Sequence, residues 1–463
     1  MIWFLLQQIG FFIFLLLTIK FVIQKRHESL LILYFFGLVF GTCFYFAITI
    51  WSPSKVVSIG MLVSMLRFDA KKDDKILIIK IIAILLLILI IVSSLIALIL
   101  PGPLPASVNP IQRLLIQDFG YLTAILLLFY GSGLKRGFAT RIFPKYCIAV
   151  EIAIITGLIH YIFNKIGVEF APILRTDGIN ENKEVVANFG GDIVQRIYGF
   201  AGEPKNFGFL VAPYLVMSFF SYFRGIIRVN SAYHLIFLAL GFFVVQQTYS
   251  SSALITVILS IAGLLVFYKL NIRPKLVGIV IIIIGSLLSY SFLKESVDVD
   301  VNNNSFWSAL ENRTFGRAQD ELENDRQEVI IWETFTEDKT IYQLFGYGIG
   351  QYSFHVPGQI EKNTIIPVQS GLVVTLVDLG FVGALFYVLY GCLIIFYLVK
   401  SKNLKKSFSS YWFILVFVTY IGGTTYGNLI TSFMLFMLAV NNFYTEQQMH
   451  YKVGKLSNKT IYN

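Results

Sequence analysis

Residues 76–100 read ILIIKIIAILLLILIIVSSLIALIL, a run in which Lys80 is the one charged side chain. About 20 apolar residues in a helix span the hydrocarbon core of a bilayer, so this run is long enough to cross a membrane. The whole chain shares its character, because its 463 residues are 56% hydrophobic and only 14% charged. Soluble domains carry roughly a quarter charged residues. The sequence therefore predicts an all-α, polytopic integral membrane protein and excludes a soluble enzyme, a disordered chain and a nucleic-acid binder.

Similar apolar runs recur along the chain and predict about twelve transmembrane helices. The stretch Ser52–Phe68 is ambiguous, either a thin thirteenth span or a segment at the membrane interface. With twelve spans the N-terminus lies in the cytoplasm, and with thirteen it lies outside. The predicted spans lie near residues 3–23, 30–51, 76–100, 114–133, 146–164, 207–223, 231–249, 251–268, 276–293, 370–398, 408–423 and 426–444.

Basic residues set the orientation, since Lys and Arg gather in short cytoplasmic loops. Clusters at 135–145, 224–228, 269–275 and 400–406 alternate with the other loops and are assigned to the cytoplasm. Both long loops then face the extracytoplasmic side. The chain divides into N-terminal spans (1–164), a first extracytoplasmic loop (165–206), central spans (207–293), a large extracytoplasmic loop (294–367), C-terminal spans (368–444) and a cytoplasmic tail (445–463).

The large loop is acidic, with 13 Asp and Glu against 6 Lys and Arg, although the whole chain carries a net charge of +10. The basic excess thus belongs to the membrane-flanking loops and indicates topology, not a polyanionic partner. The loop is also long for a mere connector. Within it, Gln319–Asp338 has the apolar periodicity of a helix.

The first long loop ends in the densest polar cluster of the sequence, RIYGFAGEPKNFG at residues 196–208. Arg196 offers a planar fork that suits a phosphate through two parallel hydrogen bonds. Glu203 is able to act as a base or to orient a sugar hydroxyl. The alternative interpretation is ordinary: Arg and Lys reach toward the membrane interface, and the Glu caps a helix.

A second candidate region lies in the large loop. Arg313, Arg317 and Arg326 are followed by FGYGIG at 345–350, whose glycines would let backbone amides approach a phosphate. The alternative for this string is a plain turn. His355 follows in a loop, where a histidine is able to titrate or donate, although a lone histidine is more often idle.

Three features together resemble the O-antigen polymerase and O-antigen ligase family of bacterial membrane proteins. The first is Arg196-Ile-Tyr-Gly followed by Glu203-Pro-x-Asn206-x-Gly. The second is the pair of short spans joined at Thr248-Tyr-Ser-Ser-Ser252. The third, in the large loop and the span after it, joins Arg326…Trp332 and the 346–350 glycines to Leu376-Val-Asp378-Leu-Gly-Phe-Val-Gly. The ordered set covers about residues 110–400.

This resemblance implies a polysaccharide polymerase in the bacterial cytoplasmic membrane, with its active site facing the periplasm or cell exterior. It would transfer a growing glycan from undecaprenyl pyrophosphate to a lipid-linked repeat unit. Because pyrophosphate is already a good leaving group, no metal and no cofactor are expected. The expected partners are undecaprenyl-pyrophosphate-linked oligosaccharides, membrane lipids and a chain-length regulator protein, with no nucleic acid.

The two polar regions described above, together with the resemblance, supply the expected site residues. Expected catalytic residues are Arg196, Glu203 and Arg326; expected substrate-binding residues are Tyr198, Lys205, Asn206, Arg313, Arg317, Gly348, Gly350 and His355.

Two departures from the family pattern favour a polymerase over the alternative, a ligase. Ser250-Ser251 stands where the family often has Ser-Arg, which puts a phosphate role there in doubt, and Gln369-Ser370 stands where ligases place His-Asn. A lipid-linked oligosaccharide or small-molecule transporter is the non-enzymatic alternative. A transporter predicts functional polar residues at mid-membrane depth and short loops throughout. The sequence shows the opposite.

Overall fold

The computed structural model describes most of the predicted helical segments and parts of both long loops. It describes residues 2–41, 44, 52–65, 77–103, 109–132, 137–168, 170, 186–189, 192–224, 231–268, 327–356, 360–361, 364–365, 371–402, 408–422 and 431–447.

This part of the chain is almost entirely helical, as predicted. The helices are α1 (Ile2–Ile23), α2 (His27–Val39), α3 (Pro53–Met65), α4 (Leu77–Ile99), α5 (Pro110–Ser132), α6 (Phe138–Lys165), α7 (Pro204–Arg224), α8 (Ser231–Gln247), α9 (Ser251–Tyr268), α13 (Gln327–Glu337), α14 (Thr340–Phe345), α15 (Gly371–Lys402), α16 (Phe408–Ile421) and a helix over 431–447. A 3-10 turn covers Tyr352–Phe354. Short antiparallel hairpins pair β1 (Val186–Phe189) with β2 (Asp192–Gln195), and β3 (Ile360–Glu361) with β4 (Thr364–Ile365).

Helices occupy every predicted span except 276–293, which lies outside the described residues. The prediction of one helix over 30–51 was wrong, because α2 ends at Val39. Gly41 then adopts a φ of +26°, and a Cβ there would lie 2.6 Å from the carbonyl oxygen of Ala201. The chain leaves the helix where the end of the first long loop packs against it.

The ambiguous stretch after α2 contains the helix α3, which packs antiparallel to α2. A Cβ on Gly37, near the end of α2, would lie 2.9 Å from the Ser54 nitrogen at the start of α3. At the other end, Ser64 Oγ lies 2.7 Å from Nδ1 of His27. With 13 residues, α3 is about 20 Å long. It therefore runs back along the full length of α2.

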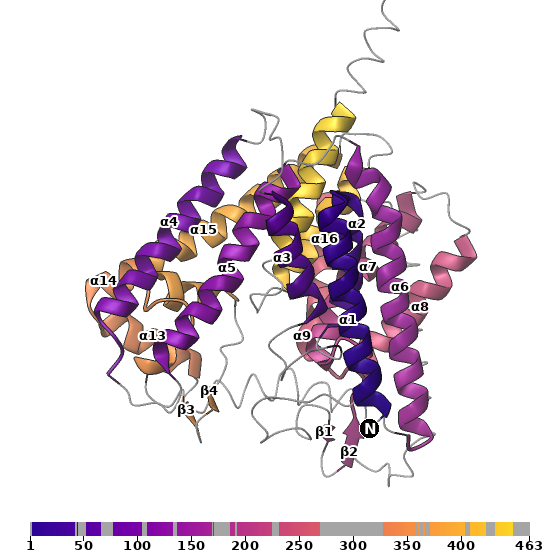
Figure 1. Cartoon of the computed structure of the whole chain (residues 1–463), viewed down its shortest axis with the longest axis horizontal. Coiled ribbons are helices and arrows are strands. Elements are labelled where there is room, and N and C mark those ends of the chain that lie inside the picture. The colour runs from indigo at the N-terminus through magenta and orange to yellow at the C-terminus, as the bar shows by residue number, and fades with distance from the viewer. Residues whose placement is uncertain are drawn as a thin grey trace, which may run out of the picture.

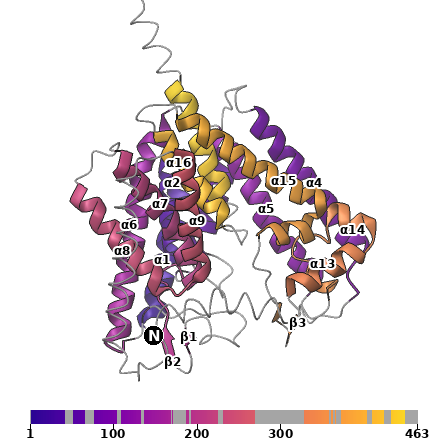
Figure 2. The ribbon, with the colours of Figure 1, turned by 180° about the vertical axis from the view of Figure 1, so that it is seen from behind.

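The start of α1 lies beside the first long loop. The ring of Trp3 has its centroid 5.6 Å from that of Phe170, which follows α6. Six helices, α1 to α6, thus bring the chain back to the end of the molecule where it began. Both hairpins and the N-terminus lie at this end in two opposite views (Figures 1 and 2). The stretch at 52–68 is thus helical over Pro53–Met65.

The helices form two groups (Figures 1 and 2). One contains α1–α3, α6–α9 and α16, and the other contains α4, α5, α13, α14 and the start of α15. The second half of α15 reaches the first group, where Tyr397 stacks on Phe413 of α16 at 5.5 Å. Gly380, with φ 70° and ψ −171°, interrupts α15 and divides it into a short first part before Gly380 and a longer second part after it, which we call its first and second halves.

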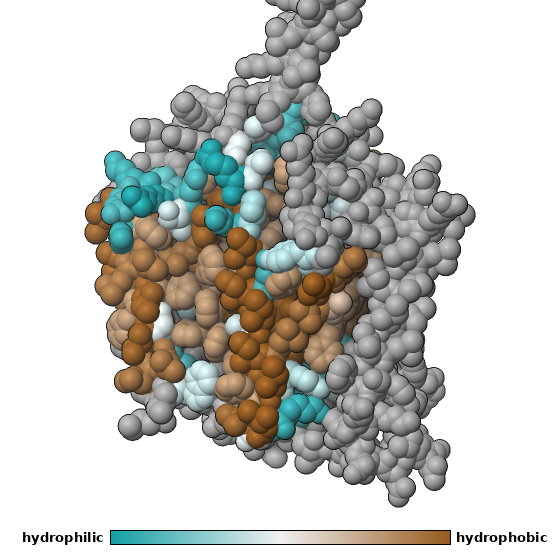
Figure 3. Space-filling view, turned by 90° about the vertical axis from the view of Figure 1, so that its right-hand side faces the viewer, coloured by the Kyte–Doolittle hydropathy of each residue, from teal (hydrophilic) through white to brown (hydrophobic). Residues whose placement is uncertain are grey.

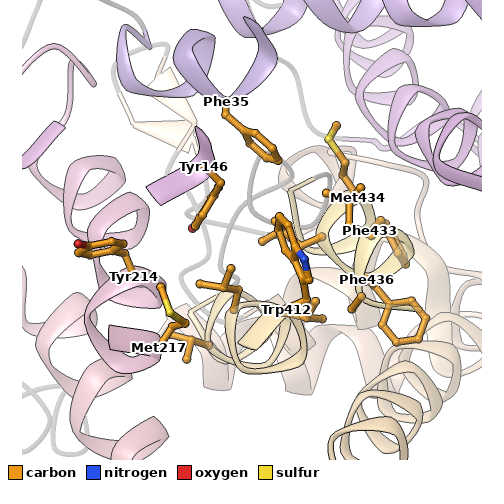
Figure 4. Packing of buried hydrophobic residues seen from close by; sticks show 14 of the residues in the cluster. Phe35, Tyr146, Tyr214, Met217, Trp412, Phe433, Met434 and Phe436 are labelled. Atoms are coloured by element: carbon orange, nitrogen blue, oxygen red, sulfur yellow. The ribbon is translucent and has the colours of Figure 1, made fainter. Parts of the chain in front are cut away.

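Aromatic side chains fill the core of the larger group (Figure 4). Trp412 of α16 is fully buried, with its ring centroid 5.2 Å from Phe143 and 5.9 Å from Tyr146 of α6. Tyr146 in turn contacts Phe35 of α2 at 5.1 Å. Such large rings carry much apolar area, so this cluster holds α2, α6 and α16 together.

The outer surface carries many apolar side chains. Figure 3 shows a broad hydrophobic area on one face, with hydrophilic residues above it and a smaller hydrophilic group below. Exposed Leu and Ile residues follow α1 and α4, as at Leu16 and Ile88. By length and composition, three helices in the described part of the chain are long and apolar enough to cross a membrane, Leu5–Ile23, Phe138–Lys165 and Val373–Ser401. The helices are thus compatible with the predicted membrane protein.

Candidate functional site

The polar cluster at 196–206, which we call the Arg196 loop, forms a tight turn after β2 and continues into the start of α7. Ala201 N donates to the Tyr198 carbonyl oxygen at 3.1 Å, closing a turn in which Gly199 has a φ of +52°. A Cβ on Gly199 would lie 2.8 Å from the Phe207 ring. Pro204 starts α7, as suits a first helical position whose N–H needs no partner. The local sequence therefore fixes both the turn and the helix start.

Arg196 is half-buried and is tied to the turn between α8 and α9. Its Nε donates to the carbonyl oxygen of Thr248 at 2.8 Å. Next to it, Ile197 N donates to the Gln247 carbonyl oxygen at 3.2 Å. These two bonds join the loop to the end of α8. The bond from Nε to the Thr248 carbonyl oxygen also orients the guanidinium plane of Arg196.

The first two motifs of the family resemblance therefore meet in space. Thr248 begins the Thr-Tyr-Ser-Ser-Ser segment, and Gly208 of the first motif packs against its far end. A Cβ on Gly208 would lie 2.6 Å from Cβ of Ala253 and 3.9 Å from Cβ of Ser250. The glycine thus lets α7 approach α9 closely, which no local sequence signal reveals.

Glu203, Lys205 and Asn206 lie at the start of α7, all half-buried. Asn206 Nδ2 donates to Oε2 of Glu203 at 2.6 Å, and the Phe207 N–H donates to the Glu203 carbonyl oxygen at 2.9 Å. Glu203 therefore stands at the cap position, where its negative charge meets the positive end of the helix dipole. The Nζ of Lys205 lies 6.0 Å from the Phe209 ring centroid. A paired carboxylate and amide, with one ammonium between them in the sequence, thus stand at the start of α7.

Tyr198, predicted to bind substrate, is buried, and its contacts are to the protein's own residues. Its hydroxyl donates to the Phe170 carbonyl oxygen at 3.0 Å, and its backbone N–H donates to Nδ1 of His160 at 3.2 Å. His160 also stacks on the Phe170 ring at 4.5 Å. The sequence interpretation did not assign His160 to this loop. Its role is to hold the loop against α6.

Phe200 fixes the other side of the loop. Its ring contacts Phe40 at 5.6 Å, Phe44 at 5.4 Å and Phe170 at 5.1 Å. This aromatic packing joins the loop to the end of α2. The loop is therefore held by three elements, α2, α6 and the α8–α9 turn, while the side chains of Arg196, Glu203, Lys205 and Asn206 remain half-buried.

The glycine string of the large loop is bound to the third motif of the resemblance. Tyr347 N donates to the Val377 carbonyl oxygen at 2.8 Å, and Gly348 N donates to that of Asp378 at 3.1 Å. Gly350 N donates to Oδ1 of Asp378 at 2.9 Å. The amides of Gly348 and Gly350, which the sequence offered to a phosphate, are thus already engaged. These are the bonds that the turn interpretation predicts, and substrate binding by the two glycines stays a prediction.

Two glycines allow this contact. A Cβ on Gly346 would lie 2.3 Å from the Asp378 carbonyl oxygen, and a Cβ on Gly380 would lie 2.3 Å from that of Leu344. Both also have a positive φ, of 82° and 70°. We call residues 346–350 with Asp378 and Gly380 the glycine knot. Arg113 of α5 adds to it, because its Nε donates to the Gly350 carbonyl oxygen at 2.7 Å.

His355, also predicted to bind substrate, is packed among aromatic rings. It stacks on Tyr347 at 4.2 Å and contacts Tyr342 edge-on at 5.0 Å. Burial lowers its pKa to about 4, Asp338 opposes this shift, and Lys339 reinforces it. His355 is therefore neutral at pH 7 and serves as a core residue of this region.

The remaining predicted site residues, Arg313, Arg317 and Arg326, lie outside the described residues. The helix α13, which begins one residue after Arg326, belongs to the group that contains α4 and α5. The strand β2 lies at the end of the other group (Figures 1 and 2). Among the residues that the structure describes, no three His, Cys, Asp or Glu side chains gather as metal ligands do.

In comparisons with known proteins, no protein-family model matches this sequence, and no curated protein matches it significantly. The candidate site therefore rests on its own geometry. In that geometry, a well-anchored turn leads into the start of α7 and carries Arg196, Glu203 and Lys205, all half-buried.

Proposed function

We propose that this chain is a polysaccharide polymerase of a bacterial cytoplasmic membrane. It transfers a growing glycan from undecaprenyl pyrophosphate to the next lipid-linked repeat unit on the outer side of the membrane. The observation that carries the proposal is the Arg196 loop: an arginine oriented by its bond to Thr248 stands close in sequence to Glu203 and Asn206 at the start of α7.

The proposed reaction uses two kinds of group. The bond between the anomeric carbon and the pyrophosphate oxygen breaks, and the leaving pyrophosphate takes the bonding electrons. Arg196 stabilises this developing charge through charge-assisted hydrogen bonds. The acceptor hydroxyl forms the new bond to the anomeric carbon and gives its proton to Glu203. Asn206 holds the Glu203 carboxylate in place through the 2.6 Å bond.

The proposed membrane arrangement has thirteen crossings, with α3 among them. Support comes from the contact between Trp3 and Phe170, which places the start of α1 and the first long loop at one end of the molecule. Basic clusters then mark the other end as cytoplasmic. The N-terminus and both long loops face outward, where lipid-linked glycans and a chain-length regulator protein would meet the Arg196 loop.

Complementation tests this function. The chain is expressed in a bacterial strain that lacks its own O-antigen polymerase, and glycan length is read on a gel. A ladder of chain lengths is the expected result. Attachment of glycan chains to the lipid core in a strain that lacks its own ligase would indicate a ligase instead. Restoration of neither, at normal levels of membrane protein, would contradict the proposal and favour a transporter.

A further inference from the structure

The helices α13 and α14 expose an apolar patch that the proposed reaction does not use. Trp332 of α13 is 49% exposed, and Ile341 and Leu344 of α14 are exposed as well. Ile341 and Leu344 are three residues apart, so they share one face of α14. Large apolar side chains grouped on a surface indicate a contact with a partner or a membrane.

This patch continues the apolar surface of α15. The Trp332 ring lies 6.4 Å from the ring of Phe381, which is itself exposed and begins the second half of α15. From Phe381 the exposed apolar residues follow one side of the helix at Leu385, Val388, Leu389 and Phe396. Residues 381–402 are long enough to cross a bilayer core. Trp332 therefore lies at one end of this exposed apolar surface.

The patch also meets the end of α4. Tyr342 of α14 donates from its hydroxyl to the Leu100 carbonyl oxygen, 3.1 Å away, just after α4 ends. The outer surface of α4 is again apolar up to that point, with exposed Leu95, Leu98 and Ile99. Figure 1 shows α13 and α14 at the ends of α4 and α15. Two separate apolar helix surfaces thus lead to the same patch.

The other faces of α13 show how the helix is set. Ile331 and Phe335 are fully buried against the rest of the molecule, whereas Glu333 and Glu337 are exposed. Because residues four apart share a helix face, Trp332 lies on a flank beside the buried face and the acids lie on the next flank. This division into buried, apolar and charged flanks is typical of a helix at a membrane surface.

We propose that Trp332, Ile341, Leu344 and Phe381 form an interfacial patch that docks onto the lipid surface of the outer leaflet. Tryptophan is enriched at the level of the lipid headgroups, where its ring meets apolar chains and its N–H meets water. Lipid is the occupant because the patch continues two helix surfaces that would face lipid. The inference rests on the proposed membrane setting and not on the polymerase chemistry.

Docking would have a consequence for the large loop. Arg326 immediately precedes α13 in the sequence. A helix α13 held at the headgroup level starts at the depth where the pyrophosphate of a lipid-linked glycan lies. The interfacial patch would thus place the start of α13, at Gln327, near the lipid surface.

Lipid quenching of tryptophan emission tests the patch. The full chain is reconstituted into phosphatidylcholine vesicles, with bromine atoms at shallow acyl positions or with none. Emission from wild type is compared with that from Trp332→Phe, and the difference reports Trp332. The control is Trp412→Phe, since Trp412 is fully buried in the core. Brominated lipid should reduce the Trp332 emission at least twofold and leave the Trp412 emission unchanged.

A second reporter guards against a misfolded variant. Leu344→Trp should add emission that brominated lipid also quenches. Emission at 332 that aqueous iodide quenches and brominated lipid does not would place α13 in water and overturn the proposal. Emission that neither quencher reduces would mean that protein covers the patch, which overturns it too. Glycan ladders are measured for the same variants. The ladders test the polymerase proposal and the quenching tests the patch, so failure of one is distinguished from failure of the other.

Discussion

The Arg196 loop and the glycine knot begin from similar sequences, glycines mixed with polar residues, and end in different roles. In the glycine knot, Asp378 is fully buried and its carboxylate and carbonyl oxygens accept from Gly350 and Gly348. In the Arg196 loop, backbone bonds and aromatic rings provide the support, and the charged side chains stay half-buried. The two regions are thus a fold-fixing contact and a candidate binding site.

The difference shows where glycine-rich motifs mislead. A glycine string reads as an anion site only while its amides are available. Once a carboxylate within the chain accepts hydrogen bonds from those amides, the motif stabilises the fold and its amides do not bind an external anion. A candidate anion site is therefore judged by which polar groups are left to bind a ligand after the backbone hydrogen bonds are assigned.

The largest effect is expected for Gly346→Ala. The new Cβ would overlap the Asp378 backbone at 2.3 Å in a segment with no room to move. The variant should give no stable protein, measured as the monodisperse fraction after detergent extraction. Gly137→Ala is the matched control, because Gly137 has a similar φ of +76° but no atom of the described residues within 4 Å of the added Cβ. It should lose only about 1–2 kcal/mol, the cost of left-handed backbone. An equal monodisperse fraction for the two variants would contradict the structural role described for the glycine knot.

A smaller loss of stability is expected for Asp378→Ala. The Gly350 N–H would lose its buried acceptor, which costs roughly 3 kcal/mol for a bond to a charged group. Thermal unfolding of the purified protein measures this loss. Asp378→Asn keeps an acceptor oxygen and should lose less. An alanine variant as stable as wild type would contradict the bonding described for the knot.

Glu203→Gln should separate chemistry from folding. Glutamine keeps the shape and accepts the bond from Asn206, but it cannot take a proton. We expect about 100-fold less polymerisation, since a general base contributes about that much, with unchanged membrane protein on an immunoblot. Near-normal ladders would reduce Glu203 to a helix cap, which is worth only about 0.3–1 kcal/mol.

The effect expected for His355 is confined to acid. The pKa of His355 is about 4 in the folded protein, below the ordinary histidine value of about 6.5. The unfolded chain therefore takes up the proton first as pH falls. Stability should be constant above about pH 6.5 and decrease from there toward pH 4. His355→Phe keeps the ring stack without titrating, so its unfolding temperature should depend less on pH in this range. An identical pH profile would show that other groups control acid sensitivity.

The sequence predicted the helices well, because each apolar run satisfies its own backbone hydrogen bonds. It failed where the decisive contact is distant. The end of α2 depends on the fit of Gly41 against Ala201, which is 160 positions away in the sequence. The kink at Gly380 likewise depends on Leu344.

The candidate site was only partly predictable for the same reason. The residue types of the 196–208 segment were sufficient to select Arg196, Glu203 and Asn206. They did not reveal that Arg196 bonds to a backbone carbonyl 52 positions away, or that His160 supports Tyr198. Backbone acceptors have no sequence signature. Only the fold distinguishes a tyrosine that holds a loop from one that would bind substrate.

The most direct test of the central claim compares two arginines that are anchored alike. Arg196 and Arg113 each donate from Nε to a backbone carbonyl, at 2.8 and 2.7 Å, but only Arg196 belongs to the candidate site. The measurement is ladder intensity per unit of membrane protein for Arg196→Lys and Arg113→Lys. If Arg196 binds pyrophosphate through its fork, lysine cannot replace it. Its ladders should then fall by about 30- to 1000-fold, corresponding to roughly 2–4 kcal/mol, while Arg113→Lys retains near-normal ladders for the protein present. Full ladders from Arg196→Lys would contradict the account.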